Sequence, residues 1–396
     1  MTDWIRVKLS DCLARVERPV NVVQDKHYTQ IGIRSHGKGV FHKESVTGEE
    51  LGNKAVYWVE PDCFVLNIVF AWEQAIGKTT ASEAGMIASH RFPMYRPKKE
   101  LVDIDYLIYF FMTKRGKDVL DAASPGGAGR NRTLGQKTFL NSNIVLPTVA
   151  EQRKIADILS AQDKVIELKT KLLEEKKRLK KYLCQMLLSG KRRIPGHAEP
   201  WKRKRLSDIA QRLTVRNTEQ CKNVLTISAS DGLVSQEAYF KKEVAGKDKS
   251  NYFLLLRDDY AYNRSSSSCN PYGTIKRLKK YSTGIVSPLY ICFRMNTNLV
   301  DVNYVEFAFD SGVLNKELDM VTQEGARNHG LLNIAVEDFF NCRMELPPYD
   351  EQVKIAEILQ ALYYSVTLLE KELEQENLKK KALMQQLLTG KIRVKV

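Results

Sequence analysis

The sequence contains no long apolar run and no paired cysteines. No window approaches the roughly 18 to 20 consecutive apolar residues of a membrane-spanning helix, and the first residues form no apolar signal segment. The seven cysteines are scattered and none belongs to a C-x-x-C pair, which argues against a zinc ribbon and against a disulfide framework. These absences predict a soluble, cytoplasmic protein with no membrane partner.

Complete catalytic motifs are missing as well. Gly77-Lys78-Thr79 resembles the end of a phosphate-binding loop, but Trp72 occupies the position of the first glycine that such a loop requires. The six histidines have neither H-x-x-x-H nor H-E-x-x-H spacing, which argues against a metal site. The sequence therefore predicts a non-catalytic chain, with no catalytic residues, no metal and no cofactor of its own.

The charge is unbalanced towards the basic side. The 396 residues include 62 Lys and Arg against 47 Asp and Glu, a net charge of +15. Clustered cations bind phosphates by displacing counterions, so this excess indicates an acidic partner. With 43% hydrophobic residues, a chain of this length is expected to fold into two or three domains.

The strongest signal is an internal repeat. Residues 146–191 and 346–391 match without gaps at an offset of 200, and about half of their positions are identical. Upstream the likeness is weaker but collinear, since the segment beginning at Trp4 recurs in the one beginning at Trp201. The architecture is therefore a module, a helix, a second module and a second helix, in which the modules have diverged and the helices have not.

The two similar segments have the features of long helices. Pro147 blocks extension upstream, Thr148 and Glu151 form a capping-box pattern, and Gly190 stands where a left-handed C-cap belongs. Each helix would cover about 40 residues, or roughly 60 Å. We expect helices at 147–190 and 347–390.

Apolar residues recur along both predicted helices at nearly heptad spacing, and each helix is the most obvious partner for the other. A second seam in the first helix, from Ile158 to Met186, would face another partner. The alternative is two independent helices, each packed on its own domain. The predicted interface and spacer residues are Ile155, Leu159, Ile166, Leu173, Leu187, Ile355, Leu359, Val366, Leu373 and Leu387.

Short β-rich runs punctuated by Gly, Ser and Asn indicate that the modules are mixed α/β, so the fold class is α+β with two repeated modules. A short basic Pro/Gly connector joins the halves. The predicted boundaries are module 1 at 1–146, the first helix at 147–190, the connector at 191–200, module 2 at 201–346, the second helix at 347–390 and a tail at 391–396.

Loops at corresponding points of both modules mix basic, hydroxyl, amide and aromatic residues, the types that contact base edges and phosphates. For any single loop, a solvated turn remains the alternative. The predicted DNA contacts in module 1 are Arg34, Ser35, His36, Lys38, Trp72, Gln74, Lys78, Thr79 and Arg91. In module 2 they are Lys247, Lys249, Asn263, Arg264, Ser266, Ser267, Asn270, Lys276 and Arg277, of which Arg264 is the candidate for a bidentate base contact.

Over nearly its whole length the sequence resembles the specificity subunits of type I restriction-modification systems. The resemblance depends on the repeated Glu-Gln-x-Lys-Ile-Ala segments at 151–156 and 351–356, on the helix endings at 187–191 and 387–391, and on residues 31–39 and 260–290 in the modules. It implies two target-recognition domains that each read one half of a split, asymmetric double-stranded DNA site, with the two helices pairing antiparallel as a spacer.

The same resemblance implies that two methyltransferase subunits and the restriction, or translocase, subunits are partners. S-adenosylmethionine, ATP and Mg²⁺ would belong to those subunits. Two other readings remain open at this point. A regulatory or architectural DNA-binding protein would act without an enzyme partner, and a coiled-coil scaffold indifferent to DNA would explain the helices but not the basic loops.

Overall fold

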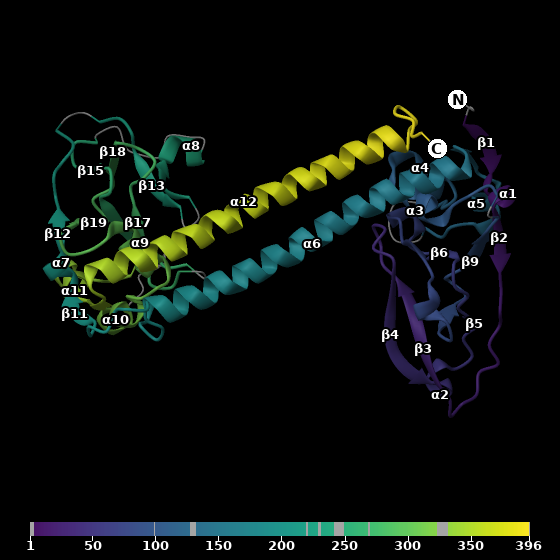
Figure 1. Cartoon of the computed structure of the whole chain (residues 1–396), viewed down its shortest axis with the longest axis horizontal. Helices are drawn as coiled ribbons and strands as arrows, with labels where there is room; N and C mark the ends of the chain where they lie inside the picture. The colour runs from purple at the N-terminus through teal and green to yellow at the C-terminus, as the bar shows by residue number, and fades with distance from the viewer. Residues whose placement is uncertain are drawn as a thin grey trace. The chain divides into compact units, whose positions relative to one another are not determined.

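The computed structural model describes residues 4–98, 100–126, 132–218, 221–228, 231–240, 249–267, 270–322 and 332–395. The chain folds as two compact units: residues 1–170 with 371–396 form unit 1, and residues 171–370 form unit 2. Each unit contains one module and a part of both long helices (Figure 1). The mixture of helices and sheets confirms the predicted fold class.

Module 1 is built on three antiparallel or mixed sheets. Its strands are β1 (Ile5–Lys8), β2 (Leu13–Val16), β3 (His27–Ile33), β4 (Val40–Thr47), β5 (Val56–Trp58), β6 (Phe64–Leu66), β7 (Ile76–Lys78), β8 (Ile87–Ser89), β9 (Met94–Pro97) and β10 (Asn143–Leu146). The module is closed by pairing of β1 with β10, its first strand with its last. A central sheet has the order β2-β9-β6-β7, and an outer sheet has the order β4-β3-β8-β5.

Short helices complete module 1, and several of them contribute residues to the core of the central sheet. They are α1 (Leu9–Cys12), α2 (Gly48–Leu51), η1 (Ala71–Glu73), η2 (Ala81–Glu83), α3 (Ile104–Met112), α4 (Lys114–Ala122) and α5 (Gln136–Asn141). Asp103 caps α3 by accepting a hydrogen bond from the Tyr106 N–H at 3.0 Å. The buried rings of Phe64, Phe111 and Phe139 pack together between α3, α5 and β6.

Module 2 repeats this framework. Its strands are β11 (Lys202–Arg205), β12 (Ala210–Leu213), β13 (Leu225–Ser228), β14 (Gly232–Ser235), β15 (Phe253–Leu256), β16 (Tyr260–Asn263), β17 (Thr274–Arg277), β18 (Thr283–Val286), β19 (Ile291–Met295) and β20 (Arg343–Leu346). Strand β11 pairs with β20 as β1 does with β10, and the central sheet β12-β19-β16-β17 has the strand order of β2-β9-β6-β7. The framework of the two modules is therefore the same.

The modules differ outside that framework. Module 2 has two separate two-stranded sheets, β13-β14 and β15-β18, where module 1 has the outer sheet β4-β3-β8-β5. Figure 1 shows β3 and β4 side by side, with α2 at their far end, whereas α8 (Gln236–Phe240) lies beside β13 and β18. The other helices of module 2 are α7 (Leu206–Ile209), α9 (Val302–Asp310), α10 (Asn315–Val321) and α11 (Val336–Asn341). Sequence divergence thus coincides with the outer strands.

The two long helices are α6 (Val149–Leu188) and α12 (Tyr349–Leu387). The Thr148 hydroxyl accepts a hydrogen bond from the Glu151 N–H at 3.3 Å, as predicted. The reciprocal half of the predicted capping box is wrong, because the Glu151 carboxylate instead binds Arg393. Gly190 and Gly390 have φ of 68° and 73°, the left-handed conformation expected just beyond a helix end.

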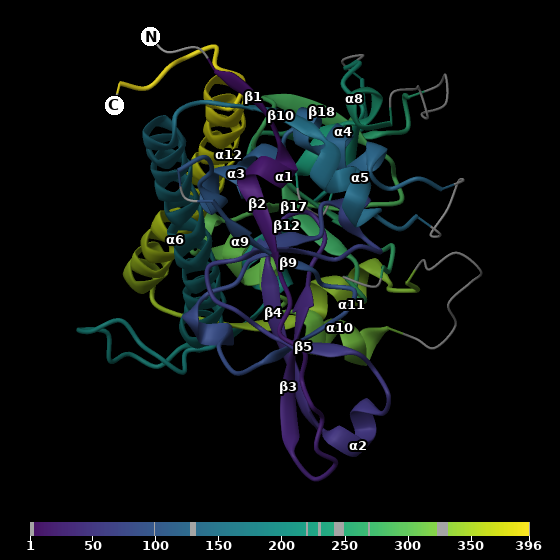
Figure 2. The same cartoon turned by 90° about the vertical axis from the view of Figure 1, so that its right-hand side faces the viewer.

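The helices run antiparallel within each unit. In unit 1, Gln162 donates to the Glu376 carboxylate at 2.8 Å, and Lys169 lies 3.0 Å from both Glu372 and Glu376. The residue numbers rise on α6 as they fall on α12, which is the signature of antiparallel neighbours. In Figures 1 and 2 the beginning of α6 and the end of α12 accordingly lie side by side.

The predicted apolar seam is used in two ways. At the helix ends it joins the module cores: Ile155, Leu159 and Leu387 belong to the core of unit 1. Their counterparts Leu187, Ile355 and Leu359 belong to the core of unit 2. Towards the helix centres, Leu173 and Val366 are buried, and Ile166 and Leu373 are half-buried. The ends of the helices are thus parts of the modules' cores, while the centres pair chiefly with each other.

Candidate nucleic-acid interface

A repeated clasp fixes each module on the helix pair. In unit 2 the buried Glu351 carboxylate accepts two hydrogen bonds from Arg193, at 2.9 and 2.8 Å, and one from the Trp201 indole N–H at 3.1 Å. In unit 1 Glu151 is held by Arg393 through contacts of 2.6 and 2.7 Å. The C-terminal tail therefore does for unit 1 what the connector does for unit 2.

The glutamine next to each clasp glutamate also has repeated contacts. The buried Gln152 amide accepts from the Asp103 N–H at 2.9 Å and donates to the carbonyls of Leu101 and Pro147. In unit 2 Gln352 makes the same three contacts, with the Asp301 N–H and the carbonyls of Leu299 and Pro347. The Glu-Gln pair in each repeat thus locks a module to the start of a helix, a role that sequence reasoning missed.

Two of the loops predicted to contact DNA in module 1 lie together. The His36 and Gly37 N–H groups donate to the Glu73 and Gln74 carbonyls at 2.8 and 2.9 Å, and the Ser35 hydroxyl donates to the Glu73 carboxylate at 2.8 Å. His36 and Gln74 adopt left-handed φ values of 61° and 58° to make these turns. The structure therefore brings the 34–39 and 72–74 loops into one surface.

Three of the predicted cations of module 1 are exposed and therefore accessible to a ligand. Arg34 and Lys38 are exposed, and the Arg34 guanidinium lies 4.7 Å from the centre of the Phe41 ring. Arg91, also exposed, follows β8. Arg132, which sequence reasoning missed, is half-buried: it lies over the Trp72 ring at 5.5 Å and donates to the Ser124 and Asp121 carbonyls at 3.1 and 3.3 Å. Exposed cations can bind phosphates, and an aromatic ring beside them can stack on bases.

Other predicted contacts of module 1 are used inside the fold. The Thr79 side chain is fully buried, and its hydroxyl donates to the Glu60 carbonyl at 2.6 Å and accepts from the Cys63 N–H at 3.0 Å. Thr79 is therefore inaccessible, contrary to the expectation of a surface contact. Lys78 is paired with Asp105 at 2.8 Å, and the Gln74 amide donates to the Phe111 carbonyl at 2.7 Å.

In module 2, Arg264 holds the predicted recognition loop rather than projecting from it. Its guanidinium donates to the Ile334 carbonyl at 2.9 Å and to the Leu289 carbonyl at 3.1 Å. These two bonds hold the guanidinium against the module, contrary to the expectation that Arg264 projects towards a base for a bidentate contact. The side chain connects the start of the loop to two other segments of the module.

The remaining loop residues have mixed exposure. Asn263, which is half-buried, accepts from the Ser265 N–H at 3.0 Å, and the backbones of Ser267 and Asn270 pair with each other at 3.1 Å. Ser266 and Lys249 are half-buried, and Lys247 lies outside the described residues.

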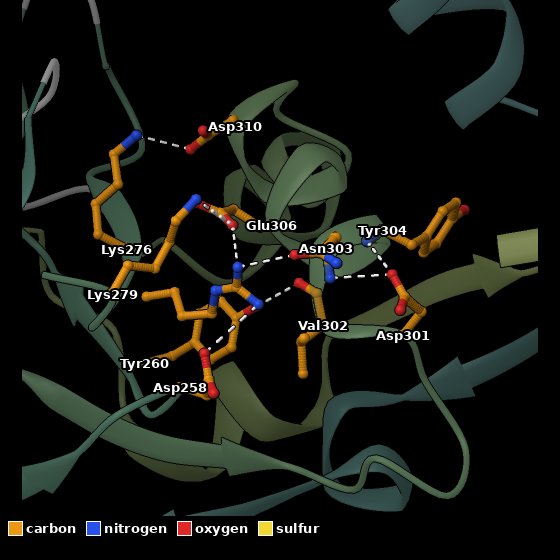
Figure 3. Close-up of polar contacts among 11 residues, drawn as sticks. Asp258, Tyr260, Lys276, Lys279, Asp301, Val302, Asn303, Tyr304, Glu306 and Asp310 are labelled. Atoms are coloured by element: carbon orange, nitrogen blue, oxygen red, sulfur yellow. Dashed lines mark hydrogen bonds and ion pairs between the residues drawn. The ribbon is translucent and has the colours of Figure 1, made fainter. Parts of the chain in front are cut away.

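Arg277 is buried and lies at the centre of a charge network, whose other members are labelled in Figure 3. It lies 2.9 Å from Glu306, donates to the Asn303 side chain at 2.9 Å and lies 3.7 Å from Asp258. Its side chain is only 6% exposed, so the expected contact with DNA is replaced by a structural role. Lys276 and Lys279 surround it and pair with Asp310 and Glu306.

Metal-ligand clusters and membrane-spanning helices are both absent from the part of the chain that the structure describes. No three His, Cys, Asp or Glu side chains in the described ranges are grouped as metal ligands would be. No helix in those ranges is both long and apolar enough to cross a membrane.

Comparison with known proteins bears on the resemblance found in the sequence. The sequence model described as "Type I restriction modification DNA specificity domain" matches residues 53–178. The type I restriction enzyme MjaVIII specificity subunit of Methanocaldococcus jannaschii is 24% identical to the chain, and the match covers 99% of the chain and 94% of that protein. The resemblance to type I specificity subunits is confirmed. A second, putative specificity subunit of the same organism, MjaX, is also 24% identical, over 82% of the chain and 77% of its own length.

Solved specificity subunits share the fold. The HsdS subunit of Thermoanaerobacter tengcongensis superposes with a TM-score of 0.57 and 15% identity, covering 98% of this chain and 97% of its own. The S subunit of the M. genitalium type I system gives 0.51 and 12%, with coverage of 97% and 96%. The long helices and repeated modules are therefore those of the specificity-subunit fold.

Proposed function

We propose that this chain supplies DNA sequence specificity to a type I restriction-modification complex, with each module reading one half of a split, asymmetric double-stranded target. The observation that carries the proposal is the contrast within each repeat. The clasp, the central sheet and the helices are duplicated, whereas the outer strands and their loops differ. The duplicated framework therefore presents two different surfaces at equivalent positions of the two units. A protein that reads two different half-sites requires such an arrangement.

The proposed DNA surface of module 1 combines its two adjoining loops with the exposed cations. Arg34, Lys38 and Arg91 would contact phosphates, and the Trp72 and Arg132 pair would contact bases or sugars. In module 2 the exposed part of the Asn263–Asn270 loop would read bases while Arg264 holds it in place.

The exposed apolar side of α6 supports the proposal of protein partners. Val165, Leu172 and Leu179 recur every seven residues and are 38%, 43% and 41% exposed. Such a stripe on a helix suits another amphipathic helix. We assign it to the two methyltransferase subunits, with the restriction, or translocase, subunits joining the resulting complex. S-adenosylmethionine, ATP and Mg²⁺ would be bound by those partners, and this chain would have no catalytic step of its own.

The proposal is tested by selecting duplexes from a random pool with the full chain, alone and together with its methyltransferase partner. We expect the selected sequences to share two short, unlike motifs at a fixed separation. A single continuous motif would contradict division of the target between the modules. Selection that is identical with and without any methyltransferase would favour a stand-alone DNA-binding protein.

A further inference from the structure

The repeat places a cavity at the same point of each unit, between the module and the helix pair. In unit 1 a cavity of about 410 Å³ is lined by Tyr109 and Met112 of α3, by Asp163 of α6 and by Lys380 and Met384 of α12. The corresponding cavity of unit 2 is about 430 Å³. Phe307 and Asp310 of α9, Tyr363 of α12, and Lys180 and Cys184 of α6 occupy the matching positions.

The two cavities differ in charge. In unit 1 the lysine is neutralised, because Lys380 lies 2.5 Å from Asp163, and Asp163 also accepts from the Tyr109 hydroxyl at 2.8 Å. In unit 2 a tyrosine, Tyr363, replaces that aspartate, and the Lys180 ammonium lies 4.7 Å from the centre of its ring instead of on a carboxylate. The equivalent lysine therefore has an acidic partner in unit 1 and an aromatic one in unit 2.

The module adds further cations to the cavity of unit 2. Five basic side chains line it against three acidic ones, Asp231, Glu306 and Asp310. Arg277 and Lys279 pair with Glu306, and Lys276 pairs with Asp310 (Figure 3). The two remaining ammonium groups, those of Lys180 and Lys280, differ from these. Among the described residues, neither Lys180 nor Lys280 is within ion-pair distance of a carboxylate, and each lies near a tyrosine ring.

We propose that the cavity of unit 2 binds a phosphate group through Lys180 and Lys280. The arrangement fits an anion because two ammonium groups without a carboxylate partner face one concave site in which basic side chains outnumber acidic ones. The phosphate has two possible sources, the DNA backbone and a free phosphorylated compound. The first of these rests on the proposed function, since it treats the site as part of the DNA footprint.

The test compares repeat-related variants of the full chain. Lys180→Gln with Lys280→Gln removes both free cations, while Lys380→Gln removes the equivalent lysine that is already paired. Affinity for a random-sequence duplex is measured between about 50 mM and 200 mM salt, and binding of inorganic pyrophosphate is measured by calorimetry. Unfolding curves check that all variants remain folded.

If the phosphate belongs to DNA, the double variant binds the duplex more weakly. The factor by which affinity falls between the low and the high salt concentration also becomes about tenfold smaller, because two phosphate contacts are lost. Lys380→Gln leaves both quantities near the wild-type values. If the source is a free compound, pyrophosphate binds the wild type and not the double variant, while duplex binding is unchanged. Unchanged binding of both probes overturns the proposal, as does an equal effect of Lys380→Gln. Failure of the wild type to select any DNA motif would instead refute the proposed function.

Discussion

Replacing Arg393 with alanine tests whether the C-terminal tail clamps unit 1. The side chain of its partner Glu151 is 3% exposed and that of Arg393 is 25% exposed. Removing one partner of a buried ion pair costs about 3 to 5 kcal/mol because the other charge stays buried. Since water can reach part of the vacated site, we expect the lower end, about 3 kcal/mol.

The repeat provides an internal comparison. Arg193→Ala should cost less, about 2 kcal/mol, because Glu351 keeps hydrogen bonds from the Trp201 indole at 3.1 Å and from the Ile194 N–H at 3.2 Å. In unit 1 the Trp4 indole nitrogen is buried and has no hydrogen-bond partner among the described residues, so it gives Glu151 no such support.

Hydrogen exchange resolved by peptide is the suitable assay. Arg393→Ala should accelerate exchange at the start of α6, residues 149–159, by roughly a hundredfold and leave residues 349–359 nearly unchanged. Lys391→Ala, an exposed change on the same tail, is the control, and Glu151→Gln in the Arg393→Ala background should restore part of the protection. Equal acceleration at both helix starts, or none at residues 149–159, would refute the clamp.

Three further outcomes are expected. Burial alone would raise the pKa of Glu83, but hydrogen bonds from His42 and from the neighbouring Ser and Thr lower it from 4.5 to about 2. The ionised Glu83 carboxylate should therefore stabilise the fold fully above about pH 4.5, and this stabilisation should be lost as the pH falls towards 2. Acid unfolding of the wild type and of His42→Ala would measure it, and the variant should lose less stability over this pH range than the wild type. Arg264→Ala should lower the stability of module 2 by about 1 to 3 kcal/mol and weaken binding to all duplexes, whereas a loss confined to one base position would restore the base-reading role. Inserting four residues after Leu173 should change the length of the gap between the half-sites but leave the half-site sequences unchanged. Sequencing of the methylated sites measures both, and an altered half-site sequence would contradict the spacer role of the helices.

Periodicity and repetition were sufficient to predict the long helices. Their apolar spacing, the prolines before them and the glycines after them are local features, and both copies carry the same signals. The observed helices begin at Val149 and Tyr349, within two residues of the predicted starts. The paired strands at the ends of each module were not predicted, because β1 and β10 lie more than 130 residues apart and their pairing has no local signature.

The candidate site was harder to predict because sequence does not reveal burial. Thr79 stands in what reads as a polar loop, yet its hydroxyl bonds to the Glu60 carbonyl and the Cys63 backbone inside the module. Arg277 stands in a basic run, and its partner Glu306 comes from a helix 29 residues further along the chain. In both cases a group from a distant segment is the hydrogen-bond or ion-pair partner of the polar side chain. Prediction from residue type alone therefore assigned too many residues to the DNA-contacting surface.

Exchange of module 2 is the decisive test of whether each module reads its own half of the target. Residues 201–346 would be replaced by the equivalent module of a related specificity subunit, and the sites methylated by the resulting complex would be sequenced. We expect one half of the target to change while the other half stays the same. A change in both halves, or in neither, would contradict the assignment of one half-site to each module.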